Sequence, residues 1–292
     1  MESPLEALPA EAIGRLSATR FTVEWVERTG STNADVLALA RDGAPEGVVL
    51  VADEQTAGRG RRDRTWTAPA VSSLLLSALL RPPARVAALS TAALALAARE
   101  AIERVAGVEV GVKWPNDLIV SGAAVGDPSG PDRKLAGVLA EADWPASAAI
   151  SSGWRAPRPD ERVVVVAGIG VNVNWPVELP EELADRATAV NHLAGGPVDR
   201  ALLLVELLVA LDGRIASLVA DGPAGLLAEW RERCVTLGLP VRVDLGPDDV
   251  VGTAVDLTDE GHLVVAGIDG VRRVLAVGDV VHVSREGPAS GG

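Results

Sequence analysis

The sequence predicts an α/β (α+β) protein in which a mixed-sheet domain with helices is followed by a small β-barrel. Up to residue 233, short apolar runs typical of buried strands alternate with helical stretches. After Cys234 the pattern changes to about five short strands within roughly fifty residues, which describes a small barrel. Turns separate these strands at 246–248, 259–261 and 269–270. We therefore place a domain boundary near residue 234.

The elements of the first domain follow in a regular order. A helix over 33–41 has a polar cap before it and Gly43 after it, and a longer helix over 86–105 closes at Gly107. Buried strands are predicted at 48–52, 73–80, 108–114, 135–141 and 163–174, and further helices at 199–219 and 223–233.

Four boundaries complete this organisation. Residues 1–20 are weakly patterned and are expected to be weakly structured, whereas 21–233 and 234–285 form the two domains. Residues 286–292 are expected to be a flexible tail. The segments 121–132 and 152–161 contain Gly, Pro, Ser and Asp and are predicted to be surface insertions.

Composition excludes several classes of protein. The net charge of −13 argues against broad nucleic-acid binding, which needs a basic surface. A lone cysteine, Cys234, cannot form an internal disulfide, which fits a reducing cytoplasm. The N-terminus lacks the pattern of a signal peptide, and the longest apolar stretch, 86–98, is too short to span a membrane. We expect a soluble cytoplasmic protein that binds neither nucleic acid nor membrane.

Lysine is almost absent from the chain. Of its 27 basic residues 25 are arginine, and the two lysines are Lys113 and Lys134. A lysine retained in such a composition indicates a position that needs a compact, movable ammonium instead of a planar guanidinium. Chance is the alternative, but both lysines lie in short polar motifs. Burying Lys134 without a partner would be costly, so it either stays exposed or awaits an anionic ligand.

An arginine-rich loop follows the strand at 48–52. It reads Gln55-Thr56-Ala57-Gly58-Arg59-Gly60-Arg61-Arg62-Asp63-Arg64-Thr65-Trp66. Four arginines fall within six residues and only Asp63 opposes them, so mutual repulsion should leave the loop poorly ordered until an anion binds. It is not a Walker loop, because no Gly-Lys-Ser/Thr follows. The alternative is a solvated arginine-rich turn.

Two further motifs place polar groups in or after strands. In Lys113-Trp114-Pro115-Asn116-Asp117 the proline stops the strand, so a cation, an indole and a carboxylate come together at a sheet edge. The structural alternative is that Asp117 caps a turn. In Gly168–Asn174 the glycines are expected to serve close strand packing, whereas Asn172 is unusual inside a strand.

Taken together, these motifs resemble the ordered motif set of the biotin protein ligases, over roughly residues 25–285. The motifs are Gly30-Ser31-Thr32-Asn33, the loop from Gln55 to Arg62 with Trp66, Lys113 to Asp117, Lys134-Leu135-Ala136-Gly137, and Gly168 to Asn172. Asp63 departs from the pattern, because the family commonly has glycine there. The twenty N-terminal residues are too few for a DNA-reading module, so the chain resembles the monofunctional members of the family.

The resemblance implies a fold and a reaction. The fold is a class II synthetase-like α/β domain followed by an SH3-like barrel. Biotin's carboxylate attacks the α-phosphate of ATP to give biotinoyl-5′-AMP and pyrophosphate, and a lysine of a biotin carboxyl carrier protein then displaces AMP. Mg²⁺ accompanies ATP, held largely by phosphates and water. The expected assembly is a monomer or a weak homodimer.

The resemblance also implies the site residues. Catalytic roles fall to Lys134, Asp117 and Arg61. The implied biotin-binding residues are Ser31, Thr32, Asn33, Gln55, Arg59, Gly60, Arg61, Lys134 and Gly137. The implied ATP- or adenylate-binding residues are Arg61, Arg62, Trp66, Lys113, Asn116 and Asn172, and no residue is assigned to a metal.

Two alternatives remain open from the sequence. A lipoate ligase or octanoyl transferase shares the catalytic architecture, although the arginine-rich loop and the Lys113 motif favour biotin. A non-catalytic, biotin-responsive regulator would need a DNA-binding element.

Retention of lysine at position 134 leads to a first prediction. Lys134→Arg should lose most adenylation activity while the fold survives, because a guanidinium keeps the charge but cannot make a point contact shared by carboxylate and phosphate. Biotin-dependent exchange between ATP and pyrophosphate measures this step. Near wild-type exchange in the variant would show that any cation suffices.

Overall fold

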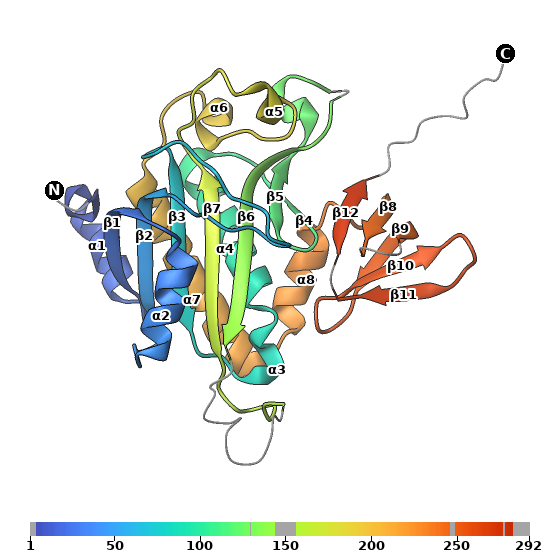
Figure 1. The fold of residues 1–292 in the computed structure, drawn as a ribbon, viewed down its shortest axis with the longest axis horizontal. Helices are drawn as coiled ribbons and strands as arrows, with labels where there is room; N and C mark the ends of the chain where they lie inside the picture. The colour runs from blue at the N-terminus through green and yellow to red at the C-terminus, as the bar shows by residue number, and fades with distance from the viewer. Residues whose placement is uncertain (1–3, 129, 144–155, 246–248, 277, 283–292) are drawn as a thin grey trace.

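The computed structural model describes residues 4–128, 130–143, 156–245, 249–276 and 278–282. The first domain is built on a seven-stranded sheet in the order β1-β2-β3-β7-β6-β5-β4 (Figure 1). Its strands are β1 (Thr22–Thr29), β2 (Val48–Gln55), β3 (Ser73–Leu80), β4 (Gly111–Lys113), β5 (Asp117–Val120), β6 (Arg133–Asp143) and β7 (Val164–Asn172). Strands β1 and β2 run parallel and the other described neighbours run antiparallel, which confirms the predicted mixed sheet.

Helices cover both faces of this sheet. In Figure 1, α4 (Ser90–Ala106) and α7 (Arg200–Asp221) lie behind it and pack on each other, while α2 (Thr32–Arg41) lies in front. The remaining helices are η1 (Pro4–Ala7), α1 (Ala10–Ser17), α3 (Ala84–Ala87), η2 (Gly122–Val125), α5 (Glu181–Ala184), α6 (Val190–Ala194) and α8 (Ala224–Arg233). Among the described helices, none combines the length and apolar character that crossing a membrane requires.

The main core fills the space between the sheet and the pair α4 and α7. Helix α4 buries Ala93, Ala97 and Ala101 completely, so that its small side chains allow close packing on its neighbours. A second apolar cluster lies under α2, where Val36 meets Leu79 of β3. The front face is therefore covered by a single amphipathic helix near β2 and β3.

Several predicted elements are confirmed and others change. The strand over 73–80 is found with the same limits. The single helix expected over 86–105 is instead two helices, α3 and α4, which are separated by residues 88 and 89. Helix α4 ends as predicted at Gly107, whose φ is 66°. The strand expected over 108–114 is shorter, since β4 covers Gly111–Lys113. Residues 152–155 of the insertion expected at 152–161 lie outside the described residues.

The N-terminal segment is more structured than expected. Helix α1 packs on α7, where Leu8 and Ala12 contact the apolar cluster that includes Val205. Arg15 of α1 donates to Glu206 of α7, a carboxylate that is only 6% exposed. The expectation of a weakly structured start was wrong, because its few apolar residues recur on one side of a short helix and find a partner far along the chain.

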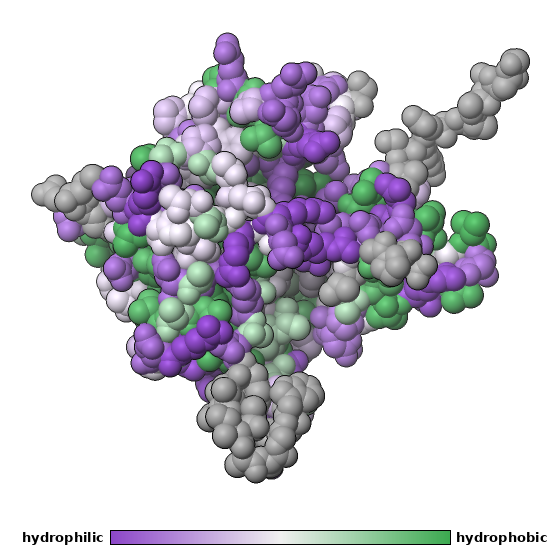
Figure 2. Space-filling model, in the orientation of Figure 1, coloured by the Kyte–Doolittle hydropathy of each residue, from purple (hydrophilic) through white to green (hydrophobic). Residues whose placement is uncertain are grey.

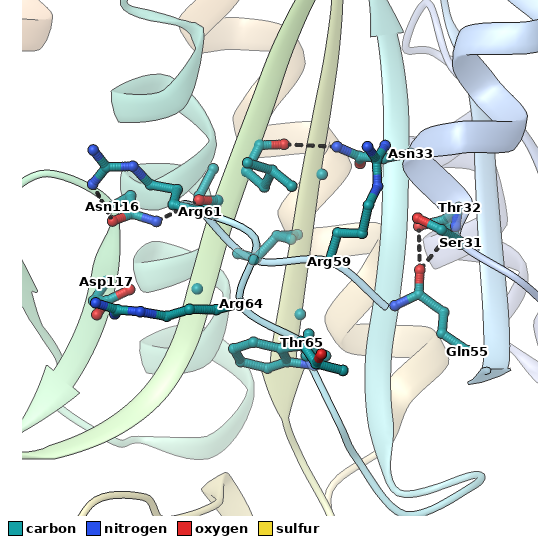
Figure 3. A pocket seen from close by; sticks show the side chains of 18 of the residues that line it. Ser31, Thr32, Asn33, Gln55, Arg59, Arg61, Arg64, Thr65, Asn116 and Asp117 are labelled. Carbon is teal, nitrogen blue, oxygen red and sulfur yellow. Dashed lines mark hydrogen bonds between the residues drawn. The ribbon is translucent and has the colours of Figure 1, made fainter. Parts of the chain in front are cut away.

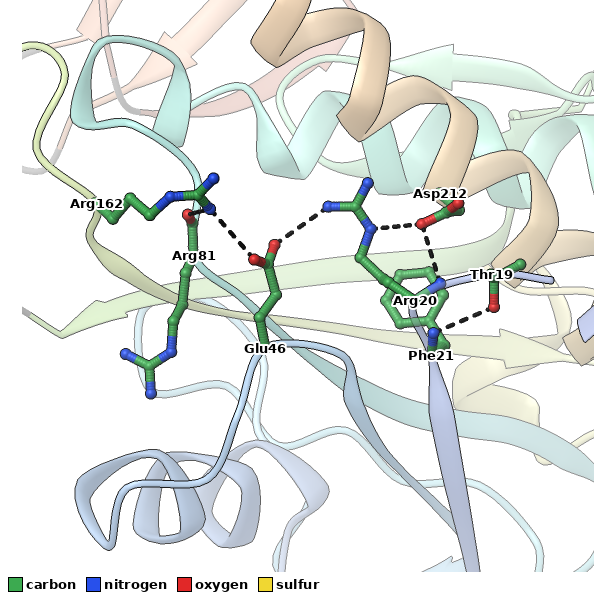
Figure 4. A network of polar contacts seen from close by, with 7 residues as sticks. All are labelled: Thr19, Arg20, Phe21, Glu46, Arg81, Arg162 and Asp212. Atoms are coloured by element: carbon green, nitrogen blue, oxygen red, sulfur yellow. Dashed lines mark hydrogen bonds and ion pairs between the residues drawn. The ribbon is translucent and has the colours of Figure 1, made fainter. Parts of the chain in front are cut away.

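Ion pairs connect the start of β1 to distant elements (Figure 4). Arg20 pairs with Asp212 of α7 and, at 3.2 Å, with Glu46 before β2. Glu46 also pairs with Arg162 at 3.2 Å. Gly47 must be glycine here, because its φ is +97° and an added Cβ would lie 2.1 Å from the Arg20 carbonyl oxygen.

The second domain is a small five-stranded antiparallel sheet in the order β11-β10-β9-β8-β12. Its strands are β8 (Pro240–Asp244), β9 (Asp249–Leu257), β10 (Leu263–Gly267), β11 (Arg272–Leu275) and β12 (Asp279–His282). Trp114 anchors it to the first domain, because the indole Nε1–H donates to the Gly261 carbonyl at 3.0 Å and the Trp114 N–H donates to Thr236 Oγ1 at 3.1 Å. The motif that ends β4 thus also holds the second domain in place.

The packing of α1 predicts a measurable effect on stability. Arg15→Ala should lower the free energy of unfolding by about 1–3 kcal/mol, because buried Glu206 loses its best partner. Urea unfolding measures the change. Arg28→Ala is the matched control, since Arg28 pairs with Glu54 on the exposed edge of β1 and should leave stability unchanged. Equal effects in both variants would mean that α1 contributes nothing specific.

Candidate functional site

One pocket brings together most of the sequence-predicted site residues. It lies at the front of the sheet, between the start of α2, the loop 58–66, β6 and the start of β12 (Figure 3). The predicted residues that line it are Ser31, Thr32, Asn33, Gln55, Arg59, Gly60, Arg61, Trp66, Asn116, Asp117, Lys134 and Gly137. Segments far apart in sequence therefore converge on one cavity.

The arginine-rich loop is a hairpin that closes on a left-handed turn. The Gly60 N–H donates to the Arg64 carbonyl at 2.6 Å, and the Arg64 N–H donates to the Arg61 carbonyl at 3.2 Å. Between them Arg62 and Asp63 have φ of 55° and 58°. Positive φ at both central positions suits glycine best, and Asp tolerates it better than most residues. Asp63 is therefore compatible with loop closure, at a cost of about 1 kcal/mol relative to glycine.

Trp66 lies flat against the middle of the sheet because glycines leave room for it. A Cβ at Gly170 of β7 would lie 2.5 Å from the indole, and one at Gly137 of β6 would lie 3.0 Å from it. Both glycines admit a side chain, and for Gly170 this differs from the expected role in close strand packing. Among the described residues the Trp66 Nε1–H has no hydrogen-bond partner, so a ligand in the pocket could accept from it.

The right-hand end of the pocket in Figure 3 is a compact polar cluster. Gln55 at the end of β2 accepts from the Thr32 N–H at 2.8 Å and from Thr32 Oγ1 at 3.1 Å. Ser31 and Thr32 are 6% and 3% exposed. Because α2 begins here, a ligand meets both side-chain groups and the start of a helix. Such a cluster suits a buried ring with directional donors and acceptors.

Asn33 lines the pocket but its amide is already committed. Its Nδ2 donates to the Leu139 carbonyl at 3.0 Å and to Glu141 Oε2 at 2.9 Å, while its Oδ1 accepts from Ser77. A Cβ at Gly168 would lie 1.9 Å from Asn33 Oδ1, so the glycine is needed for this arrangement. Asn33 therefore supports the wall of the pocket. Both polar atoms of its amide already have partners, which disfavours the predicted direct contact with biotin.

Lys134 and Asp117 form an ion pair in the pocket. The Nζ of Lys134 lies 2.6 Å from Asp117 Oδ1 and 5.4 Å from the centre of the Trp66 ring. The side chains are 36% and 27% exposed. Lys134 was expected to stay exposed or to await an anionic ligand, and it is partly exposed. It also has a partner within the chain, because β5 pairs with β6 and places Asp117 directly opposite Gly137, near Lys134. A charged pair thus lines the pocket and is partly open to a ligand.

Arg61 joins the two domains across the pocket. Its Nη1 donates to Asn116 Oδ1 at 3.2 Å and to the Gly278 carbonyl at 3.3 Å. Burial lowers the pKa of the Arg61 guanidinium from its ordinary value, against the nearby charges of Asp279 and Asp117. A guanidinium remains protonated at neutral pH, so Arg61 keeps its charge inside the pocket.

Acidic residues outside the loop offset the repulsion expected within it. Arg62 pairs with Asp279 at 3.3 Å and with Asp244 at 3.4 Å, and Arg64 also pairs with Asp279. Arg59 pairs with Glu141. In the space-filling view, hydrophilic side chains gather where the loop meets the second domain (Figure 2). These carboxylates lie on β6, β8 and β12, far from the loop in sequence. Poor order of the loop before an anion binds stays a prediction.

Three predicted nucleotide-side residues do not line the pocket. Arg62 points to the second domain, as its ion pairs show. Lys113 lies beside His282, where burial first and then the lysine's charge lower the pKa of the imidazole. Asn172 is 1% exposed and donates to the Thr188 carbonyl at 2.9 Å, so it braces the chain beside the pocket.

Further residues line the pocket beyond those predicted from the sequence. The apolar wall comes from Leu76, Val138, Leu139 and Ile169, and Arg64 and Asp279 add charges at the rim. Ile169 and Val138 had a signal, since each adjoins a motif glycine. Asp279 had none, because it begins a short strand in the other domain.

The arrangement can bind and activate an acid. A polar cluster at one end suits an uncharged ring, an apolar wall suits a hydrocarbon chain, and Lys134 with the loop arginines suits carboxylate and phosphate. Fixed cations around two anions lower the barrier to joining them. The fold and site define an α/β protein with a cationic, ligand-activating pocket and a small C-terminal sheet.

Comparisons with known proteins agree with this description. Residues 25–149 match the Biotin/lipoate A/B protein ligase family, and residues 236–283 match the Biotin protein ligase C terminal domain. The biotin--[acetyl-CoA-carboxylase] ligase of Mycobacterium tuberculosis is 36% identical over 97% of this chain and 97% of that protein. The bifunctional ligase/repressor BirA of Bacillus subtilis is 31% identical over 84% of this chain and 70% of its own length.

A solved structure shares the whole architecture. The biotin protein ligase from Aquifex aeolicus in complex with biotin and ATP is 26% identical, with a TM-score of 0.70, over 90% of this chain and 99% of that one. Given these relatives, the chain belongs to the biotin protein ligase family.

The glycine under Trp66 gives a prediction about the site. Gly170→Ala should displace the indole and reduce biotin-dependent ATP–pyrophosphate exchange by about tenfold or more, because a Cβ would lie 2.5 Å from the ring. Gly213→Ala on α7 is the control, since an added Cβ there has open space around it. Unchanged exchange in Gly170→Ala would show that the ring can move without cost.

Proposed function

We propose that this chain activates biotin with ATP and transfers it to a lysine of a biotin carboxyl carrier protein. The observation that carries the proposal is one pocket, in a chain of the biotin protein ligase family, that joins the polar cluster of Thr32 and Gln55 to Lys134 and Arg61. Biotin's ring fits the cluster, and its carboxylate would reach the cations.

In the first step a carboxylate oxygen of biotin attacks the α-phosphorus of ATP. A new P–O bond forms, the bond to the β-phosphate breaks, and pyrophosphate leaves. Two anions must meet, so the main task of the protein is to hold positive charge around them. Lys134 takes the central contact in this proposal and Arg61 supports the phosphate side.

In the second step the ε-amine of the carrier lysine attacks the acyl carbon of biotinoyl-5′-AMP. A C–N bond forms, the C–O bond to AMP breaks, and the amine gives up a proton. Asp117 is the proposed acceptor or orienting group for that amine. Asp117 Oδ1 lies 2.6 Å from Lys134 Nζ. Because Lys134 is the proposed contact of the reacting carboxyl group, Asp117 would lie next to that group.

Water must be kept from the mixed anhydride between the two steps. Trp66 lies over Gly137 and Gly170, at the floor of the pocket, and the loop 58–66 lies across its front. We propose that the loop covers the intermediate from the front while Trp66 excludes water on the side of the sheet, and that loop opening admits the carrier lysine.

The remaining parts of the proposal come from the chemistry of the substrates. Mg²⁺ would accompany ATP on its phosphates and water, since this ion keeps much of its hydration. The carrier protein is the proposed macromolecular partner. Nucleotide-side roles for Arg62, Lys113 and Asn172 would need the loop or neighbouring segments to move. A cytoplasmic location and a monomer or weak homodimer stay part of this proposal.

Isotope exchange between ATP and pyrophosphate tests the function. Exchange should require biotin, and mass spectrometry should show biotin on the lysine of an added carrier domain. The same exchange is measured with lipoic acid in place of biotin, to test which acid the protein activates. Exchange with lipoic acid and not biotin would assign the chain to lipoate chemistry, and no exchange with either acid would rule out acid activation.

A variant separates the two steps. Asp117→Asn should slow transfer from preformed biotinoyl-5′-AMP more than it slows exchange, because an amide cannot take a proton from an ammonium. The ion pair with Lys134 predicts a smaller loss in exchange as well. Single-turnover transfer and exchange are compared on the same preparation. Equal losses in both would make Asp117 a support for Lys134 and place the transfer base elsewhere.

A further inference from the structure

Glu141 is a carboxylate of β6, two residues beyond Leu139, which lines the pocket. We propose that Glu141 is a positioning residue that holds Arg59 over the biotin end of the pocket before biotin binds. The inference rests on the proposed function, because it names the substrate whose binding should change. It assigns to Glu141 no contact with the reacting atoms.

The geometry joins three elements at one atom. Glu141 Oε2 accepts from Arg59 Nη2 at 2.7 Å and from Asn33 Nδ2 at 2.9 Å. Arg59 belongs to the loop and Asn33 to the first turn of α2. In Figure 3 the Arg59 side chain extends from the loop towards Asn33. One carboxylate oxygen thus links the loop to the helix that begins at the polar cluster.

The two partners of Glu141 depend on it to different degrees. Asn33 keeps further contacts without it, since Nδ2 also donates to the Leu139 carbonyl at 3.0 Å and Oδ1 accepts from Ser77. For the Arg59 guanidinium, Glu141 is the ion-pair partner that the structure provides. Loss of Glu141 should therefore release Arg59 and leave Asn33 in place.

Release of Arg59 should affect ligand binding more than folding. The Arg59 side chain is 45% exposed and that of Glu141 27% exposed, and ion pairs so open to solvent stabilise the fold little. An arginine has many rotamers, however, and a free side chain must be ordered again each time biotin binds. Holding it beforehand removes that cost from the binding step.

The same strand supplies a matched control. Asp143, two residues further along β6, pairs with Arg41 of α2 at 2.8 Å, and its side chain is 30% exposed. This pair also links β6 to α2, but it involves neither the loop nor a residue that lines the pocket. Asp143→Ala therefore removes a similar ion pair and leaves Arg59 held.

The experiment measures KM for biotin and for ATP in the exchange reaction. Glu141→Ala should raise the KM for biotin about tenfold, which corresponds to ~1.4 kcal/mol, and leave the KM for ATP and the melting temperature unchanged. Asp143→Ala should match the wild type. In the double variant Glu141→Ala/Arg59→Ala the KM for biotin should equal that of Arg59→Ala alone, because Glu141 acts through Arg59.

Other outcomes would overturn the inference. Additive losses in the double variant would mean that Glu141 acts through Asn33 or through the fold. A normal KM for biotin in Glu141→Ala, or an equal rise in Asp143→Ala, would also contradict it. Absence of exchange in the wild-type protein would instead refute the proposed function, so the two failures are distinguishable.

Discussion

The structure depends on holding several arginine side chains close together in one loop despite their mutual repulsion. Four arginines within a short hairpin would repel one another, and carboxylates from elsewhere in the chain pair with three of them. The fourth, Arg61, donates to Asn116 Oδ1 and to the Gly278 carbonyl. Asp279 at the edge of the second domain pairs with Arg62 and Arg64, and Glu141 of the large sheet pairs with Arg59. These contacts place the loop across the pocket with its charges available to a ligand. An anion entering the pocket meets cations that are already in position.

This constraint explains why the second domain belongs to the site. Arg61 donates to the Gly278 carbonyl, and Trp114 fixes the turn at Gly261 to the end of β4. The motif that carries Asn116 and Asp117 therefore has two tasks, since it lines the pocket and anchors the neighbouring domain. A displacement of the small sheet would move the arginine loop and the pocket wall together.

Glycines on β6 and β7 also shape the pocket, because they leave room for side chains that lie against the sheet. Gly137 and Gly170 admit the Trp66 ring, and Gly168 admits the amide of Asn33. A flat sheet surface with side chains at these positions would lift the ring and the loop away from Lys134. The absence of a Cβ is here a means of placing other side chains, at a modest entropic cost to the strand.

The sequence by itself determined the class of fold and most of the pocket residues. Local patterns suffice for this, because period and capping mark strands such as 73–80, and a lysine kept at 134 marks a special cation. They failed where the signal is weak: β1 is an edge strand with many polar residues, and β5 begins directly after a motif that ends another strand.

Only the tertiary structure decided which charges meet. Arg64 and Asp279 are 215 residues apart, and Arg59 and Glu141 are 82 apart, so no local pattern could pair them. The partner of Lys134 followed from the pairing of β5 with β6. The hydrogen bonds of Asn33 followed from the approach of α2 to β6 and β3. Charge pairing depends on distance in space, and the sheet order sets that distance.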